Sequence, residues 1–447
     1  TGANNTAVGR AALFANTTTN NNTAIGYRAL DVNTASANTA VGADAGGATT
    51  TGANNVFVGS AAGLNNTTGS ENVVVGRDSF YENTTGASNT ALGYQALEKN
   101  TTADNNTAVG YKALEANTTG ANNTAVGYQS LDANTTGIDN VALGAQALGA
   151  NTTGDQNTGI GLQALEKNTT ADSNTAVGFK ALEENTTGAN NTAVGANALT
   201  ENTTGANNIA MGYNSLDANT TGGNNTGLGF AALGGNTVAS NNTAVGYLAL
   251  NETTTGANNV SVGSEALEKN TTGGSNVAVG LRALEANTTA EKNIAIGDNA
   301  LRTSTTSGYN IAVGSNALYA NTGGHANVAV GHKAMESNTT GEDNVGIGAS
   351  ALYANTTSSY NTAVGNRAMP SNTAALNTAV GSLCMYSNTT GTENTAVGQA
   401  SLYTNSTGSY NTAVGRYALR LSTTGDYNTA VGRNALTANT TASNNTG

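Results

Sequence analysis

The chain has 447 residues, of which only 10% are charged, and its formal net charge is -12. This is neither the roughly 25% charge of an ordinary globular domain nor the profile of a disordered chain, which combines high net charge with few apolar residues. No basic stripe is present, which argues against nucleic-acid binding, and no apolar run approaches the ~20 residues of a membrane-spanning helix.

A short repeat organises the whole chain. The stretch 106–122, NTAVGYKALEANTTGAN, is one copy, and 26 complete copies run from Asn5 to Asn444, 24 of them with 17 residues and two with 16. Such a period is typical of a solenoid, in which length counts coils rather than domains. We therefore expect residues 1–447 to form a single continuous solenoid with partial repeats at both ends, cut from a longer chain.

The first five residues of the repeat predict a strand. Position 1 is always Asn and position 5 always Gly, whereas position 2 is Thr, Val or Ile and position 4 is aliphatic or Met. Position 3 is mostly Ala. This period-2 alternation indicates a short strand. Because Thr exchanges with Val and Ile at position 2, we expect positions 2 and 4 to face the core.

Positions 6 to 12 predict a helical turn. Ala, Leu, Glu, Lys and Gln predominate there, and these residues form helices more readily than strands. Position 9 is Leu in 20 copies and is expected to point into the coil, while Asn at position 12 is suited to ending the turn in the left-handed region. Thr-Thr-Gly then leads back to the next strand.

The predicted fold is thus a β-solenoid with one short parallel strand and one helical turn per coil, in about 26 coils. Irregular copies support a shared core, because Gly46 and Gly63 replace Leu next to copies that carry Phe57, Val74 and Phe80. Such pairing of large with small residues indicates volume compensation between coils. The residues expected to build the structural ladder of the stack include Asn106, Asn123, Gly110, Gly127, Leu114 and Leu131.

No residue cluster indicates catalysis, a cofactor or a bound metal. The only histidines, His325 and His332, lie in neighbouring coils near Glu336 and Asp343, but neither recurs elsewhere in the repeat. A solvated polar face explains them better than a metal or acid–base site. Cys384 stands at a position that is otherwise Ala or Ser, which indicates a small core residue. The expected protein is not an enzyme.

Two features are candidates for surface chemistry. Tyr residues recur at outward positions and could grip carbohydrate or protein, or could merely cover the Leu row; the candidates at position 10 are Tyr319, Tyr353, Tyr386 and Tyr403. The NTT turns match the N-glycosylation pattern, with Asn100, Asn117 and Asn134 as possible acceptors, although Asn and Thr are also simply good turn residues. Asn at the junction between copies, as in Asn122-Asn123-Thr124, matches the same pattern.

The strand motifs NTAVG, NVAVG and NIAIG resemble the head repeats of YadA-like trimeric autotransporter adhesins. The longer unit NTAVGYxALxxNTTG is similar to repeats of bacterial and phage tail-fibre-like proteins. The resemblance implies a homotrimer in which three chains pack side by side, and an extracellular location on a cell or virion surface.

The function expected from these features is that of a structural and adhesive fibre or filament shaft that self-associates and contacts carbohydrate or a host surface. One alternative is an ice- or surface-binding Thr-rich solenoid. Its weakness is that Val and Ile interrupt the Thr rows at position 2, as in a buried row. Another alternative is a glycan-decorated surface filament. An enzyme would need a local cluster of Asp, Arg or His that breaks the repeat.

Overall fold

The computed structural model describes residues 2–447, and the chain divides into two compact units, of which the first ends at Asn224 and the second begins at Asn225. Each unit is a parallel β-solenoid with one three-residue strand per coil, so the expected period and stacking are confirmed. In unit 1 the strands are β1 (Thr6–Val8), β2 (Thr23–Ile25), β3 (Thr39–Val41), β4 (Val56–Val58), β5 (Val73–Val75), β6 (Thr90–Leu92), β7 (Thr107–Val109), β8 (Thr124–Val126), β9 (Val141–Leu143), β10 (Thr158–Ile160), β11 (Thr175–Val177), β12 (Thr192–Val194) and β13 (Ile209–Met211).

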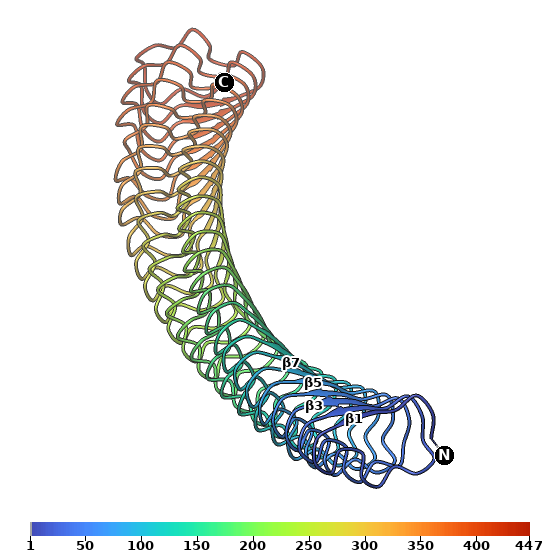
Figure 1. The fold of residues 1–447 in the computed structure, drawn as a ribbon. Helices are drawn as coiled ribbons and strands as arrows, with labels where there is room; N and C mark the ends of the chain where they lie inside the picture. Colours follow the sequence, from blue (N-terminus) through green and yellow to red (C-terminus); the bar gives the residue numbers. More distant parts are fainter. Residues whose placement is uncertain (1) are drawn as a thin grey trace. The chain divides into compact units, whose positions relative to one another are not determined.

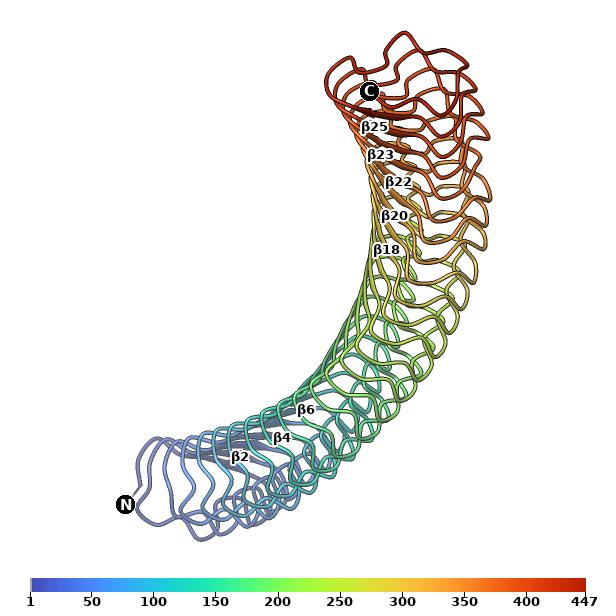
Figure 2. The same cartoon turned by 180° about the vertical axis from the view of Figure 1, so that it is seen from behind.

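Unit 2 repeats the same design. Its strands are β14 (Thr226–Leu228), β15 (Thr243–Val245), β16 (Val260–Val262), β17 (Val277–Val279), β18 (Ile294–Ile296), β19 (Ile311–Val313), β20 (Val328–Val330), β21 (Val345–Ile347), β22 (Thr362–Val364), β23 (Thr378–Val380), β24 (Thr395–Val397), β25 (Thr412–Val414) and β26 (Thr429–Val431). Figure 1 shows the labelled strands of unit 1 side by side, and Figure 2 those of unit 2 from β18 to β25.

Adjacent strands within a unit pair in register. In β7 and β8, for example, Thr107 lies opposite Thr124, Ala108 opposite Ala125 and Val109 opposite Val126. Equivalent residues of successive coils therefore form straight rows along each unit. Each row consists of equivalent residues from successive coils, so a substitution in one coil alters the contacts with the coils on either side.

The strands face the opposite way from the prediction. Ala108 and Ala125 at position 3 are fully buried, whereas positions 2 and 4 are half-buried or exposed in every strand. Where Leu occupies position 9 of the surrounding coils, the inside of the coil is too narrow for residues larger than Ala; Phe57 fits because Gly46 and Gly63 replace Leu beside it. A Cβ on Gly159, at position 3 of β10, would lie 3.3 Å from Leu148 Cγ and 3.0 Å from the Ala164 carbonyl oxygen. Position 3 therefore has room for Ala, and the β-branched residues point outwards.

Positions 6 to 12 form successive tight turns, and the predicted helical turn is wrong; no helix occurs in residues 2–447. Lys112 and Leu114 have left-handed φ angles of 52° and 56°, which an α-helix cannot contain. The Leu97 amide donates to the Ala113 carbonyl of the next coil (3.0 Å) instead of to its own coil. The physical reason is spacing, because a helix about 10 Å wide cannot stack on copies that advance by about 4.8 Å.

Leu at position 9 points into the core as predicted, and Leu114 and Leu131 are fully buried. The predicted volume compensation is also confirmed. A Cβ added to Gly63 would lie 2.2 Å from Phe57 Cε1, and one added to Gly46 would lie 2.7 Å from Phe57 Cδ2. The Phe57 ring therefore fills the space that two Leu side chains occupy elsewhere in the stack.

The invariant Gly at position 5 is required by close contact between coils. Gly110 has φ of 140°, and a Cβ there would lie 2.2 Å from the carbonyl oxygen of Gly127 in the next coil. Any side chain at this position would force the coils apart. The Gly110 and Gly127 column thus sets the tight stacking at the end of each strand.

Two rows of buried Asn run through each unit. At position 1, the Asn123 amide donates to Asn106 Oδ1 (2.9 Å), and Asn106 Nδ2 donates across the coil to the Gly120 carbonyl (3.0 Å). At position 12, Asn117 Nδ2 donates to Asn100 Oδ1 (3.0 Å) and also to the Gly120 carbonyl (2.9 Å). The two rows therefore brace the turn from both sides. The second row replaces the predicted helix-ending role of position 12, and the left-handed residue is instead at position 17, where Asn122 has φ of 60°.

Candidate functional site

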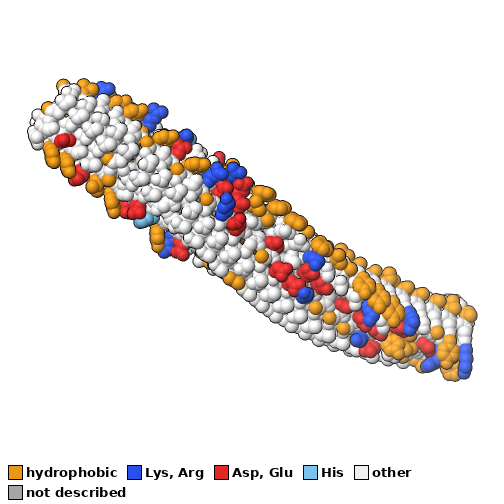
Figure 3. Space-filling view, turned by 90° about the vertical axis from the view of Figure 1, so that its left-hand side faces the viewer, with side chains coloured by type: hydrophobic (Ala, Val, Ile, Leu, Met, Phe, Trp, Pro, Cys, Tyr) orange, Lys and Arg blue, Asp and Glu red, His pale blue; other side chains and the backbone are white. Residues whose placement is uncertain are grey.

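The outer sheet face is a uniform surface that runs along each unit. We define it as the side chains at positions 2 and 4 of the strands, which in all 26 strands are Thr, Val, Ile, Leu or Met. Several are strongly exposed, including Leu143 (47%), Met211 (45%) and Ile209 (41%). Figure 3 shows hydrophobic side chains along the margins of one face of the chain, with clusters of charged side chains between and beside them. The outer sheet face thus offers apolar contact without a formal charge.

Aromatic residues flank this face at position 6, directly after the Gly column. Tyr94, Tyr111 and Tyr128 stack on one another with ring centroids 5.5 and 5.4 Å apart, and the Arg77 guanidinium lies 5.8 Å from the centroid of the Tyr94 ring. Because the inner faces of stacked rings cover each other, this row presents mainly ring edges and hydroxyl groups to solvent. Inside the row, few ring faces are left open for a sugar to stack on.

The four Tyr residues predicted as a binding surface do not form one row. Tyr386 and Tyr403 stack at 5.1 Å, but Glu336 stands between Tyr319 and Tyr353 at the equivalent position, and Pro370 stands between Tyr353 and Tyr386. Their position 10 lies on the turn side of the coil. The structure therefore brings together one pair of the four.

The candidate glycan acceptors Asn100, Asn117 and Asn134 are fully buried. Their Nδ2 atoms donate along the position-12 row, for example from Asn134 to Asn117 Oδ1 at 2.9 Å. A glycan on these nitrogens would break the row, so the folded coil offers none of them as an acceptor. The adjoining Thr residues also have a structural role, because Thr118 Oγ1 donates to the Thr135 carbonyl of the next coil (3.0 Å). Of the matching Asn residues, the exposed Asn122 is the more accessible.

A row of carboxylates runs along the turns at position 10. Glu98, Glu115 and Asp132 occupy consecutive coils of unit 1. Burial, reinforced by the neighbouring Glu115, raises the pKa of Glu98, and the same two causes raise the pKa of Asp132. After Asp132 the row is interrupted at Gly149, where a groove of about 220 Å³ is lined by Gln129, Asp132, Gln146, Gly149, Ala150, Glu166 and Lys167.

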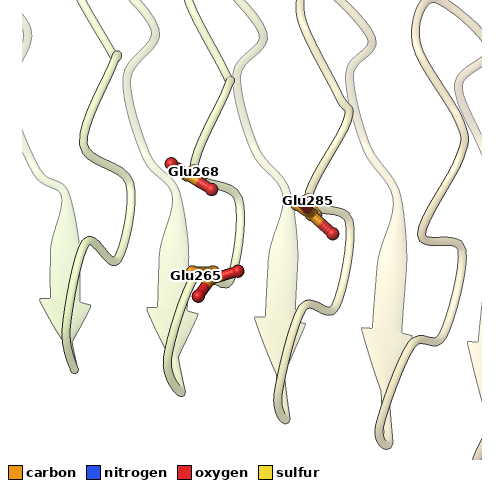
Figure 4. Close-up of side chains that lie close together, drawn as sticks. All are labelled: Glu265, Glu268 and Glu285. Atoms are coloured by element: carbon orange, nitrogen blue, oxygen red, sulfur yellow. The ribbon is translucent and has the colours of Figure 1, made fainter.

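Three carboxylates of unit 2 lie close enough to share one ion (Figure 4). Ligand oxygens of Glu265, Glu268 and Glu285 all lie within 4.8 Å of one another. Arg282 Nε, however, lies 2.7 Å from Glu265, and Arg302 Nε lies 2.6 Å from Glu285. The two guanidinium groups neutralise two of the three charges. Glu268 and Glu285 are at position 10 of their copies, whereas Glu265 is at position 7, so the repeat pattern alone does not place the three side chains together.

The remaining chemistry-bearing residues have local partners. His325 Nδ1 lies 3.3 Å from Glu342, and the Asp343 backbone amide donates to the His325 carbonyl (3.2 Å). Cys384 is fully buried, its Sγ lies 3.1 Å from Ser401 Oγ, and burial raises the pKa of the thiol to about 11. The thiolate, which is the reactive form, is therefore scarce at neutral pH. These placements give neither residue the surroundings of a catalytic group.

No family model and no curated protein matches the chain. Residues 2–447 contain no helix that is long and apolar enough to cross a membrane. The candidate functional site is therefore defined by geometry alone, as the outer sheet face with its two flanking edges.

Proposed function

We propose that this protein is a non-enzymatic shaft segment of an extracellular fibre that is displayed on a cell or virion surface. In this fibre, copies of the chain pack against one another through their outer sheet faces. The observation that carries the proposal is the unbroken row of aliphatic or Met side chains at position 4 of that face in both units. Exposed apolar patches above a few hundred Å² mark interaction sites in soluble proteins. Here one patch continues from strand to strand, as in β7 and β8, where Val109 lies opposite Val126.

Three copies are the number that we propose. The resemblance of the NTAVG strands to YadA-like adhesin heads supports a homotrimer, and a short strand with one apolar side is suited to such an arrangement. The row that touches the neighbouring chain, however, is formed by positions 2 and 4. The Ala row at position 3 is buried inside the coil and cannot make this contact.

Light scattering on the full chain, combined with electron microscopy and mass per unit length, tests this function. We expect three chains per rod. The variant Val109→Lys/Val126→Lys places charges on the outer sheet face and should dissociate the rod. Its matched control, Thr119→Lys/Thr136→Lys, adds the same charge at exposed turn residues and should leave the assembly intact. A stable monomer at micromolar concentration of the unmodified chain would refute the proposal.

A second function, binding to ice or another ordered surface, is favoured by one observation. Thr at position 2, in 16 of 26 copies, points outwards, and Thr107 lies directly opposite Thr124 in the next strand. The interruptions by Val and Ile therefore no longer indicate burial. Thermal hysteresis of the purified protein, lost on replacing Thr107 and Thr124 by Lys, would support this function. Its absence, with an intact trimer, would leave the shaft as the function.

Binding to carbohydrate or a host surface, and the attachment of glycans, would then occur on the surfaces that remain exposed in the assembly. The stacked pair Tyr386 and Tyr403 lies on the turn side, away from the outer sheet face. Glycan-array binding by the intact chain, compared with a Tyr386→Ala/Tyr403→Ala variant, tests whether this pair contributes to carbohydrate or host-surface contact. Mass spectrometry of protein from its natural source would show whether exposed Asn residues such as Asn122 carry glycans.

A further inference from the structure

The two edges of the outer sheet face carry complementary residues. We call position 17, before each strand, the entry edge, and position 6, after each strand, the exit edge; a strand with its two edge residues forms one level. Large apolar or aromatic side chains occupy the exit edge at ten levels: Tyr27, Tyr94, Tyr111, Tyr128, Leu162, Phe179, Tyr213, Phe230, Tyr247 and Leu281. They occupy the entry edge at five others: Tyr309, Tyr360, Leu376, Tyr410 and Tyr427. No level carries a large residue at both edges.

Charged residues at the two edges are complementary as well. Both edges are charged at only two levels, and the signs are opposite in each: Glu71 and Arg77 flank β5, and Lys292 and Asp298 flank β18. The order of signs is reversed between the two levels, so a general preference of one edge for one charge does not explain the pairing. These four side chains are exposed.

At the last two levels of unit 2 the pairing is of a third kind. The entry edge carries an exposed Tyr and the exit edge an exposed Arg, first as Tyr410 with Arg416 and then as Tyr427 with Arg433. Arginine stacks favourably on the face or edge of an aromatic ring. Bulk, charge and aromatic character therefore all complement across a level.

Contacts within one chain do not produce this complementarity. The two edge residues of a level are six residues apart along an extended segment, which separates them by about 20 Å. Their actual neighbours are different: Arg77 Nε lies 3.0 Å from Asp78, and Lys292 Nζ lies 3.2 Å from the Tyr309 hydroxyl. A residue that has no contact with its counterpart in the same chain can match it only through a neighbouring copy.

We propose that neighbouring copies pack parallel and in register, with the exit edge of one copy against the entry edge of the next copy at the same level. This inference rests on the proposed self-assembly and adds which edges meet and at which register. Closed cyclic symmetry places equal levels of all copies at equal height, so no large apolar or aromatic edge residue meets another, and at the two levels with charges at both edges each charge meets its opposite. At β7, Tyr111 of one copy then lies against Asn105 of the next.

Disulfide cross-linking of the full chain tests the register. Both variants carry Cys384→Ala, the residue most common at that position, and Tyr111→Cys; the same-level variant adds Asn105→Cys, and the offset variant adds Asn207→Cys, about 30 Å further along the stack. After oxidation with Cu(II)–phenanthroline, we expect at least tenfold more covalent oligomer from the same-level variant. The offset variant should stay at the level of the single-Cys controls.

Light scattering on the same samples separates the two proposals. An oligomer that cross-links equally poorly in both variants, or better in the offset variant, overturns the edge pairing and leaves the shaft function standing. A monomer refutes the self-assembly on which both depend. If the cysteines disturb folding, a second test remains. Glu71→Arg or Arg77→Glu alone should raise the dissociation constant at least tenfold, whereas the double reversal should restore it, and additive losses would contradict the pairing.

Discussion

At the scale of single residues, the stability of each coil depends on buried amides that are satisfied only by the next coil. Asn388, Asn405 and their equivalents are fully buried, and Asn405 Nδ2 donates to Asn388 Oδ1 at 2.8 Å. Burying an amide is costly unless its hydrogen bonds are made. An interruption of the row therefore leaves a buried amide without a hydrogen-bond partner and lowers the stability of the fold.

Such a defect occurs at Ser422. Neither Asn405 Oδ1 nor Ser422 Oγ has a hydrogen-bond partner within the protein, because Ser is too short to continue the row. We predict that Ser422→Asn raises the stability of unit 2 by about 1–2 kcal/mol, since its Nδ2 would reach Asn405 Oδ1. Thermal unfolding followed by circular dichroism measures the change. Ser422→Ala, which removes the hydroxyl without supplying a donor to Asn405, is the control and should give the smaller gain; a lower midpoint for Ser422→Asn would contradict the role of the row.

The second Asn row could have been predicted from the sequence. At position 12 the only replacements are Thr and Ser, at Thr49, Thr253, Ser304 and Ser422, all of which keep a hydrogen-bonding group. A site selected for a left-handed backbone would accept more types, as position 17 does with Glu71, Ser88 and Tyr309. The pattern of exchange thus distinguished the two roles, and position 12 was misassigned because Asn fits both.

At the scale of the strand and its neighbours, volume is shared between coils. Phe57 in β4 occupies the space left by Gly46 and Gly63. We predict that Gly63→Leu destabilises unit 1 by about 1–3 kcal/mol through overpacking against the Phe57 ring. The left-handed φ of 60° is no obstacle, since Leu114 adopts 56° at the same position.

The same substitution should cost less when the ring is absent. In a Phe57→Ala background, Gly63→Leu restores the residues found in most coils and fills the cavity. A double-mutant cycle by thermal or chemical unfolding measures the coupling between the two sites. If the two changes were additive, Phe57 and Gly63 would not share one space.

The carboxylate row gives the turns a pH dependence. Because the pKa values of Glu98 and Asp132 are raised in the folded chain, it binds more protons than the unfolded chain above the ordinary value of about 4. The stabilisation by protonation is complete below that value and is lost as pH rises through the folded pKa. We predict that Glu98→Gln/Asp132→Asn flattens the fall in melting temperature between pH 4 and pH 7, whereas Glu82→Gln, at an exposed site, leaves the slope unchanged. An unaltered slope in the double variant would show that the row does not carry the effect.

The orientation of the strand could not be read from residue types alone. Free exchange of Thr with Val and Ile at position 2 is compatible with burial, but an exposed sheet face favours the same β-branched residues. The deciding fact is the narrow coil interior, seen in the contact of Ala108 and Leu114 with the rows around them, and this depends on the three-dimensional path of the turns. The predicted helical turn failed for a related reason, because propensity at Lys112 and Ala113 ignores the spacing between coils.

At the scale of the whole molecule, length should be adjustable in steps of one coil. Stability of a solenoid is approximately a sum over repeats and the contacts between neighbours. We predict that deleting residues 174–190, one complete coil of unit 1, preserves the circular dichroism spectrum and lowers the melting temperature by only a few degrees. Deleting residues 174–181 should unfold the surrounding coils, because it breaks the Asn rows and the Gly column. Equal effects of the two deletions would contradict a modular stack.

Nearly identical coils also allow strands to pair with the wrong neighbour during folding. A strand such as β7 finds nearly the same hydrogen-bonding partners one coil earlier or later in the chain. Most rows would tolerate such a slip without a clash. Phe57 would not, since a neighbouring coil displaced by one repeat would bring Leu30 where Gly46 belongs. The Phe57, Gly46 and Gly63 set therefore fixes the register of unit 1, because it allows only one order of neighbouring coils in an otherwise repetitive chain.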